Sequence, residues 1–351
     1  MKIIENNNEK IAEAKFYLWS IGDILSHDFG EEEWLIESLI PKQGITALSG
    51  NPGDFKTWTT IHIALCVARN MPVFNKFKVD QGGVLVVDEE DHIRLLKKRL
   101  GSLGAEDSDN IFYLSQSGLK VDLLDVRKHI LKIVKEKNIK LLILDSLVRV
   151  HSQEENDAGG MSKVFMGLQD FIKAGVSILF THHHRKQQGF GANNLGQSMR
   201  GSSDILAAVD CHITVEKNRD EENRLVFKQS KLRQGEALKP FEVSVLIGGL
   251  GPSGFEFVGE FNEKKKKLEE SVEGIVFLLM DGMKSRQEII DALKEELGRD
   301  TIDSGLKIAE KDKRIEKVPK EQLPVGDHKN YYRIFESPYE GEIISNELPA
   351  S

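Results

Sequence analysis

The chain has 351 residues, which is enough for one large domain and one small domain. It is 40% hydrophobic and 30% charged, and it has no apolar run near the ~20 residues of a membrane span, which excludes a membrane-spanning protein. The net charge of −8 argues against a broad nucleic-acid-binding surface, although positive charge confined to a channel would escape this test.

Residues 1–30 are expected to form an N-terminal leader. Their first part, MKIIENNNEKIAEAK, has no apolar signal core and no cleavage pattern, which predicts a cytoplasmic protein with no membrane partner. Cys66 and Cys211 are too few for a disulfide framework or a zinc module. We expect both cysteines to pack as apolar residues.

Short apolar runs alternate with helical stretches in the first part of the chain. The runs are ITALSG (45–50), GGVLVVDE (82–89), IFYLS (111–115), KLLILDS (140–146) and VSILFTHH (176–183). Amphipathic helical patterns lie between them at 57–69, 92–104 and 126–138. This alternation predicts an α/β fold with a mostly parallel sheet and helices on both faces.

The pattern changes at Cys211 to short alternating strands. They are CHITVEKN, RLVFKQSKL, FEVSVLI and GFEFVGEF, and RDEEN between the first two suits a hairpin turn. These strands predict antiparallel edges on the same sheet. The first domain is therefore expected to span residues 31–260.

Residues 261–270 are charged and poor in strand-forming residues, which predicts an interdomain linker. The lysine run at 264–267 is followed at once by acids, so a solvated linker is favoured over a nucleic-acid patch. Residues 341–351 are expected to form a tail.

Residues 271–340 have the pattern of a separate small domain. A first helix is expected to end at Gly282, a second opens with Ser285 and Glu288 in capping-box spacing, and a third is capped by Asp300 or Thr301. The segment NYYRIFES then returns as a strand. Three helices and a hairpin predict a winged helix-turn-helix-like domain, and its nearly balanced charge leaves open whether it binds DNA or protein.

SGNPGDFKTW, residues 49–58, follows the first strand and resembles a phosphate-binding loop. Gly50, Lys56 and Thr57 are in register with G-x-x-x-x-G-K-[ST], but Phe55 occupies the last glycine. A left-handed backbone there would cost on the order of 1–2 kcal/mol, which a large domain tolerates. The alternative is an ordinary strand–helix turn.

Carboxylates follow two other strands. DEED (88–91) would present an acid at the same end of the sheet as the loop, where it could orient and deprotonate a water molecule. The alternative is that these acids cap the helix that begins near His92. Asp145 ends LLILDS in the position of an acid beside a bound Mg²⁺.

The fifth strand ends in THHHRK (181–186). Neighbouring side chains of a strand point to opposite faces, so the three histidines cannot all bind one metal ion. One of them could instead hydrogen-bond the γ-phosphate of a nucleotide. The Gly- and Asn-rich tract at 187–203 is expected to be a mobile loop that handles ligands.

In this order, the motifs resemble the RecA-like P-loop ATPases, and most closely the branch of the plasmid RepA hexameric replicative helicases. The similarity covers about residues 34–235. It rests on EWLIESLIPKQGITALSGNPGDFKTW, VVDEEDHIRLLKKRL, LLILDSL, ILFTHHHRK, RGSSDI and KLRQGE. It implies ATP and Mg²⁺ as the bound cofactors.

The resemblance also implies roles for individual residues. The nucleotide loop would comprise Gly50, Asn51, Pro52, Gly53, Asp54, Phe55, Lys56, Thr57 and Trp58. Thr57 and Asp145 would hold Mg²⁺, Glu90 would be the catalytic base, and His183 or His182 would sense the γ-phosphate. Arg200 in RGSS would act as an arginine finger in a neighbouring subunit. Lys231 and Arg233 in KLRQG would bind the nucleotide from the same intersubunit face, the alternative being a solvated edge strand.

The function implied is an oligomeric Mg²⁺-dependent ATPase, possible as a hexameric ring, that acts on single-stranded DNA. It would serve as a helicase or translocase in the replication or recombination of a mobile element. An alternative is an ATP-switched module whose C-terminal domain recruits DNA or a partner protein. A third interpretation is a signalling ATPase or self-phosphorylating kinase.

Overall fold

The computed structural model describes residues 2–3, 17–28, 30, 32–184, 203–218, 221–323 and 329–335. The chain divides into two compact units, Met1–Gly259 and Glu260–Ser351. Within the described residues, no helix is long and apolar enough to cross a membrane.

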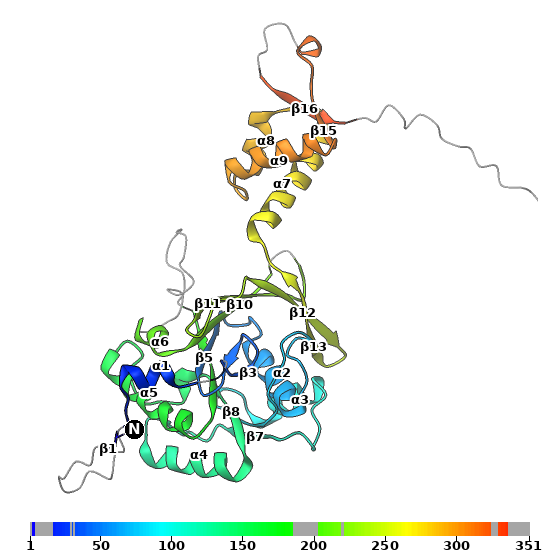
Figure 1. Ribbon diagram of the computed structural model, residues 1–351. Helices are drawn as coiled ribbons and strands as arrows, with labels where there is room; N and C mark the ends of the chain where they lie inside the picture. The colour runs from blue at the N-terminus through cyan, green and yellow to red at the C-terminus, as the bar shows by residue number, and fades with distance from the viewer. Residues whose placement is uncertain are drawn as a thin grey trace, which may run out of the picture. The chain divides into compact units, whose positions relative to one another are not determined.

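A nine-stranded sheet forms the centre of the first unit (Figure 1). Its strands are β5 (Ile45–Gly50), β6 (Gly83–Asp88), β7 (Ile111–Ser115), β8 (Ile139–Asp145), β9 (Ser177–His183), β10 (Cys211–Lys217), β11 (Arg224–Leu232), β12 (Phe241–Gly248) and β13 (Gly251–Glu260). Their order is β13-β12-β11-β10-β5-β9-β8-β6-β7. Strands from β10 to β7 in this order pair in parallel, while β11 pairs antiparallel with β10 and β12. The expected mostly parallel sheet with antiparallel edge strands is confirmed.

Helices cover both faces of this sheet, which explains why its central strands are continuous apolar runs. Helices α2 (Lys56–Arg69) and α3 (Ile93–Ser102) belong to one core cluster, and α4 (Leu124–Lys137), α5 (Ala158–Lys173) and α6 (Ser203–Ala208) contribute to the other. Helix α5 was not anticipated, although Met161, Val164, Leu168 and Phe171 form its buried stripe. Cys66 and Cys211 are free and buried, as expected.

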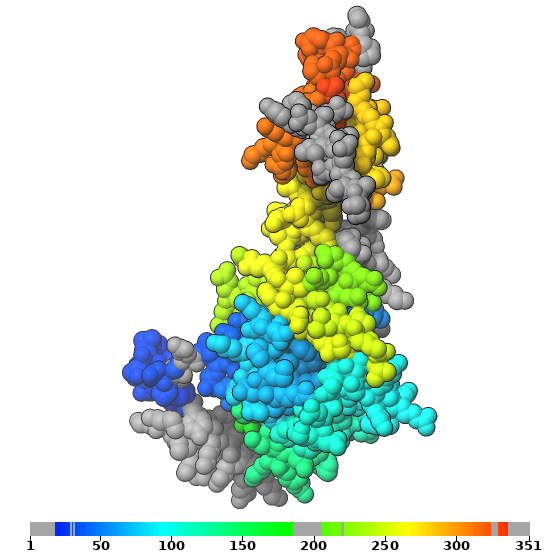
Figure 2. All heavy atoms as spheres, turned by 90° about the vertical axis from the view of Figure 1, so that its right-hand side faces the viewer, coloured from blue at the N-terminus to red at the C-terminus, as the bar shows by residue number. Residues whose placement is uncertain are grey.

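The antiparallel strands are held to α2 by an aromatic cluster. Phe74 packs against Phe227, and Phe241 stacks on Phe227 with ring centroids 5.3 Å apart. The hydroxyl of Ser102, at the end of α3, donates to the Pro252 carbonyl at 2.7 Å. Figure 2 shows this face, where blue and cyan atoms from the first third of the chain lie beside yellow atoms from around residue 250. His62 of α2 stacks on Phe74 with ring centroids 5.4 Å apart, so both α2 and α3 are joined to the antiparallel strands.

Short elements precede and connect the main ones. They are β1 (Lys2–Ile3), β2 (Tyr17–Leu18), α1 (Ile21–Ser26), β3 (Trp34–Ile36), β4 (Ile40–Pro41) and the 3₁₀ turn η1 (Leu147–Arg149). The turn η1 follows β8 directly and so borders the carboxyl edge of the sheet.

The described residues of the second unit form three α-helices and a small antiparallel sheet. Its elements are α7 (Glu263–Leu279), β14 (Lys284–Ser285), α8 (Arg286–Leu293), α9 (Arg299–Lys311), β15 (Ile315–Lys317), the 3₁₀ turn η3 (Lys320–Gln322) and β16 (Tyr331–Ile334). The strands are arranged in the order β14-β16-β15. The winged-helix-like assignment of this unit stays a prediction.

One local expectation for this unit was wrong and one is confirmed. The stretch 261–270, expected as an interdomain linker, is mostly helical, because Asn262 caps α7 and the lysine run lies in the first turns of that helix; its role as a linker stays a prediction. Helix α9 begins at Arg299, after Gly298 and without a side-chain cap, so neither Asp300 nor Thr301 is its cap. The capping box of Ser285 and Glu288 forms as expected.

Candidate nucleotide-binding site

The loop between β5 and α2 has the backbone of a tight phosphate-binding turn. A Cβ atom on Gly50 would lie 2.5 Å from the Val215 carbonyl oxygen of β10, so only glycine fits there. Gly53 has a φ of +89°, which also favours glycine. Phe55 has φ 61° and ψ 18°, so it adopts the left-handed conformation at the N-cap of α2. The residue at the position of the missing glycine thus takes a glycine-like conformation.

The side chains of Asp54 and Lys56 form hydrogen bonds with backbone groups of the loop. The Asn51 N–H donates to Asp54 Oδ2 at 2.8 Å. The Lys56 ammonium donates to the carbonyl oxygens of Gly50 and Asn51 at 2.9 and 2.8 Å. Lys56 is only 7% exposed, and burial lowers the pKa of its ammonium. An ammonium forms stronger hydrogen bonds with anionic oxygens than with carbonyl oxygens, so a bound anion would replace the two carbonyls as partners of Lys56.

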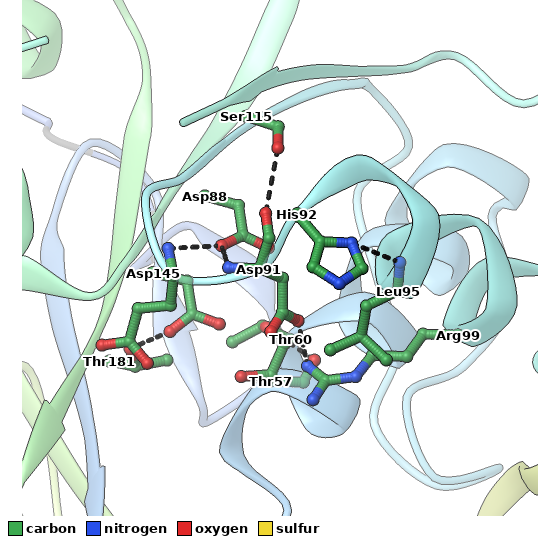
Figure 3. A network of polar contacts seen from close by, with 11 residues as sticks. Thr57, Thr60, Asp88, Asp91, His92, Leu95, Arg99, Ser115, Asp145 and Thr181 are labelled. Atoms are coloured by element: carbon green, nitrogen blue, oxygen red, sulfur yellow. Dashed lines mark hydrogen bonds and ion pairs between the residues drawn. The ribbon is translucent and has the colours of Figure 1, made fainter. Parts of the chain in front are cut away.

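Asp145 ends β8 next to the start of α2 (Figure 3). It is 3% exposed, and Thr181 of β9 donates its hydroxyl to Asp145 Oδ1. Burial raises the pKa of Asp145, while hydrogen bonds from Thr181 and Thr57 act in the opposite direction. Strand β9 lies between β5 and β8 in the sheet, so the loop and this acid face each other across one strand.

The four acids after β6 have distinct surroundings. Asp88 Oδ1 accepts from the backbone N–H groups of Glu90 and Asp91, and burial raises the pKa of Asp88 to about 6. Glu89 accepts from the Ser117 N–H, the Ser117 hydroxyl and the Gly118 N–H. Asp88 and Glu89 therefore shape the turn and hold the loop after β7.

The other two acids of this turn line the pocket, and none of the four caps α3. Asp91 forms an ion pair with Arg99, whose guanidinium lies 5.5 Å from the centroid of the Trp58 ring. The side chain of His92 caps α3 by accepting from the Leu95 N–H (Figure 3).

Glu90 faces the loop from the opposite side of the pocket. The Ser146 hydroxyl donates to Glu90 Oε1 at 2.5 Å, and His183 Nε2 lies 3.7 Å from the same oxygen. The contact with His183, helped by Ser146, lowers the pKa of Glu90 to about 2 against the opposing effect of burial. Glu90 is consequently ionised at neutral pH.

The three histidines at the end of β9 separate as the strand alternation requires. His183 turns to Glu90, while His182 is buried, with Nδ1 3.5 Å from Glu155 Oε1. His184 Nε2 lies 3.0 Å from the hydroxyl of Ser49. Of the two histidines considered as phosphate sensors, only His183 lines the pocket.

These groups lie around one depression of about 350 Å³. Its lining residues come from the ends of β5, β6, β8, β9 and β10 and from α2 and α3: Pro52, Gly53, Phe55, Lys56, Thr57, Trp58, Glu90, Asp91, Arg99, Asp145, His183 and Lys217. The volume falls in the range of small-molecule sites. The carboxyl ends of parallel strands are where ligands bind in such sheets.

Thr57 and Asp145 suit a magnesium ion. The described part of the chain has no group of three His, Cys, Asp or Glu side chains arranged to hold a metal. A metal between the Thr57 hydroxyl and the Asp145 carboxylate would therefore take its other ligands from phosphate and water. Mg²⁺ binds in this way at nucleotide sites, so these residues fit it.

Lys231 and Arg233 lie outside the pocket. The Lys231 ammonium donates to the carbonyl oxygens of Leu206 and Ala207 at 2.8 and 3.0 Å. Arg233 donates to the Ala207 carbonyl and pairs with Asp210. Both side chains thus hold the C-terminal end of α6. Arg200 lies outside the described residues.

Three residues of the site were missed from the sequence. Lys217 lines the pocket, while Thr181 and Ser146 donate hydrogen bonds to Asp145 and Glu90. Thr181 lies two positions before His183, so strand periodicity could have placed it on the same face. Ser146 directly follows Asp145, and its hydroxyl was not considered. No local signal identifies Lys217, which reaches the loop only because β10 pairs with β5.

The model of a family described as AAA domain (AAA_25) matches residues 10–189, just over half of the chain. A similar solved structure is titled "The Structure Of A DnaB-Like Replicative Helicase And Its Interactions With Primase", with 14% identity and a TM-score of 0.49. The match covers 68% of this chain and 66% of that chain, so it spans just under two thirds of the helicase chain.

Proposed function

The chain belongs to this AAA domain family and has its P-loop ATPase core, and we propose that it is an oligomeric Mg²⁺-dependent ATPase acting on single-stranded DNA. It would work as a helicase or translocase in the replication or recombination of a mobile element. The observation that carries the proposal is the convergence of Lys56, Glu90, Asp145 and His183 on one pocket at the carboxyl edge of the sheet.

Each of these pocket residues would have a separate role in the transfer of the phosphoryl group to water. Lys56 would leave the Gly50 and Asn51 carbonyls to bind the β- and γ-phosphate oxygens. Thr57 and Asp145 would hold Mg²⁺, which when bound neutralises charge on the phosphates. Ionised Glu90 would orient the attacking water and accept its proton.

His183 would couple the nucleotide to Glu90. In this structure the contact with His183 is the main reason why the pKa of Glu90 is so low. A phosphate oxygen that attracts the imidazole would weaken this contact and make Glu90 a stronger base. Hydrolysis would thus depend on the γ-phosphate being in place.

Arg200 is proposed to complete a neighbouring subunit's site, as an arginine finger does. Helix α6 begins three residues after Arg200 and is held by Lys231 and Arg233. Those two residues would therefore support the intersubunit face. A hexameric ring is the assembly proposed.

The test is ATP hydrolysis with and without single-stranded DNA. Lys56→Ala and Arg200→Ala should each lose activity, and mixing the two variants should restore part of it, because intact Lys56 and intact Arg200 then meet across an interface. Failure of the wild type to bind or hydrolyse ATP would overturn the ATPase. Absence of rescue on mixing would overturn the role of Arg200 in trans.

A second candidate is an ATP-switched regulator without strand-separating activity. It is favoured by the ion pairs Arg286–Asp303, Arg314–Glu273 and Arg333–Glu316, which occupy arginines that DNA would need. The C-terminal unit would then dock a protein. A strand-displacement assay separates the two candidates, since the regulator predicts ATP binding with no displacement. The remaining kinase interpretation requires labelled phosphate on the protein after incubation with γ-labelled ATP.

A further inference from the structure

Lys217 enters the nucleotide pocket from a part of the chain where no motif was expected. It is the last residue of β10, the strand that pairs with β5 and whose Val215 carbonyl abuts Gly50. Its backbone N–H lies 3.5 Å from Asp54 Oδ1, and its exposed side chain lines the pocket beside Phe55.

The ammonium of Lys217 rests on an aromatic ring. It lies 5.0 Å from the centroid of Phe55, within the ~6 Å of a cation–π contact. Among the described residues, no carboxylate or carbonyl is hydrogen-bonded to it. Lys56, in contrast, is held by two carbonyls, and Arg99 is paired with Asp91. Of these three pocket cations, Lys217 is therefore the one whose charge is available to bind an anionic ligand.

The contact with the Lys217 ammonium is a physical reason for phenylalanine in place of glycine at position 55. Glycine at this position would avoid the left-handed strain but would leave nothing under the ammonium. The ring is fixed by its backbone conformation and by packing against the core cluster on this face of the sheet. A rigid ring beneath a flexible lysine limits the positions that the ammonium occupies.

The charges of the pocket indicate what the ammonium would bind. Glu90, Asp91 and Asp145 line one wall, and only Asp91 is balanced by an arginine. A polyphosphate entering such a pocket needs positive charge beyond that of Lys56. The Lys217 ammonium supplies this positive charge. It would pair with a phosphate oxygen, because a nucleobase carries no negative charge for it to pair with.

We propose that Phe55 and Lys217 form a second phosphate clamp, in which the ring holds the Lys217 ammonium against a phosphate oxygen of the bound nucleoside polyphosphate. The clamp rests on the proposed function, because it adds a ligand to the same nucleotide. It makes the replaced glycine a binding feature of this chain.

The clamp is tested by titrating full-length protein with Mg²⁺ and ADP or a non-hydrolysable ATP analogue. Lys217→Met should weaken both nucleotides about 10-fold, the size expected for one charge-assisted hydrogen bond, and Lys217→Arg should retain most of the affinity. Unchanged affinity in Lys217→Met would overturn the clamp.

The role of the ring is tested by a double-mutant cycle. Phe55→Leu keeps an apolar side chain and the left-handed backbone but removes the ring. It should weaken binding about 3-fold in the wild type and have no further effect in Lys217→Met. An equal loss in both backgrounds would overturn the coupling between ring and lysine.

A matched control lies on α4. The Lys137 ammonium is also 5.0 Å from a ring centroid, that of Phe112, but neither residue lines the pocket. Lys137→Met should leave nucleotide affinity unchanged. If the wild type binds no nucleotide, the proposed function falls together with the clamp. If binding is lost in Lys56→Ala but kept in Lys217→Met, only the clamp falls.

Discussion

Replacing Phe55 with alanine and with glycine measures the cost of its backbone conformation. The residue has φ 61° and ψ 18°, in the left-handed region. Both variants lose the partly buried ring, so the loss of packing cancels between them. Alanine keeps a Cβ atom in the unfavourable conformation, and glycine does not.

The expected difference follows from two opposing contributions. The left-handed conformation costs a residue with a Cβ roughly 1–2 kcal/mol, whereas glycine loses roughly 0.5–1 kcal/mol more backbone entropy on folding. Phe55→Gly should therefore have a free energy of unfolding about 0–1.5 kcal/mol higher than that of Phe55→Ala.

Urea unfolding followed by tryptophan fluorescence suits this comparison. The chain has three tryptophans, Trp19, Trp34 and Trp58, and all lie in the first unit, so the signal reports on the unit that contains the loop. If the alanine variant is more stable than the glycine variant by about 0.5–1 kcal/mol, position 55 is not left-handed and the loop geometry is wrong.

The remaining predictions concern the surroundings of the loop. Thr181→Val removes the hydroxyl donor to buried Asp145 and should lower the free energy of unfolding by about 1.5–3 kcal/mol. Thr181→Ser keeps the donor and should stay close to wild type in the same urea titration. A loss below about 0.5 kcal/mol in Thr181→Val would contradict this hydrogen bond. Lys231→Met should lower stability by about 1 kcal/mol, because α6 loses two carbonyl contacts; unchanged melting with collapsed ATP hydrolysis would instead show that Lys231 acts on a nucleotide. The pKa of Glu90 is about 2 in the folded protein against an ordinary 4.5, so its stabilising contribution is present above pH 4.5 and is lost as the pH falls toward 2. Glu90→Gln should therefore lose less stability than the wild type between pH 5 and pH 3 in thermal melts, and parallel curves would refute this assignment.

The sheet could be predicted from the sequence because its strands are short, apolar and separated by amphipathic helices. Each expected strand from ITALSG to VSILFTHH forms, within one or two residues of its expected ends. The helical conformation of 263–270 was not predicted, because the first half of α7 is polar and its buried residues begin only at Ser271.

The site could be predicted only where one motif carries the information. Lys56 and Thr57 follow from the loop pattern, and Asp145 from the end of an apolar strand. The resemblance implied Glu90 as the base, and the structure adds the partners: Glu89 accepts from Ser117, whereas Glu90 accepts from Ser146. Strand alternation predicted that His183 and His182 point to opposite faces of the sheet. Only the structure shows which of them faces the pocket. Lys217 depends on a strand pairing that no local pattern encodes.

The most direct measurement is MgATP hydrolysis by Glu90→Gln and Glu89→Gln, with nucleotide binding measured alongside. Both variants should bind nucleotide. Hydrolysis by Glu90→Gln should fall about 10²–10⁴-fold, while Glu89→Gln, which keeps an acceptor oxygen for Ser117, should stay within about 3-fold of the wild type. Wild-type hydrolysis by Glu90→Gln, or an equal loss in both variants, would contradict a pocket in which Glu90 activates water.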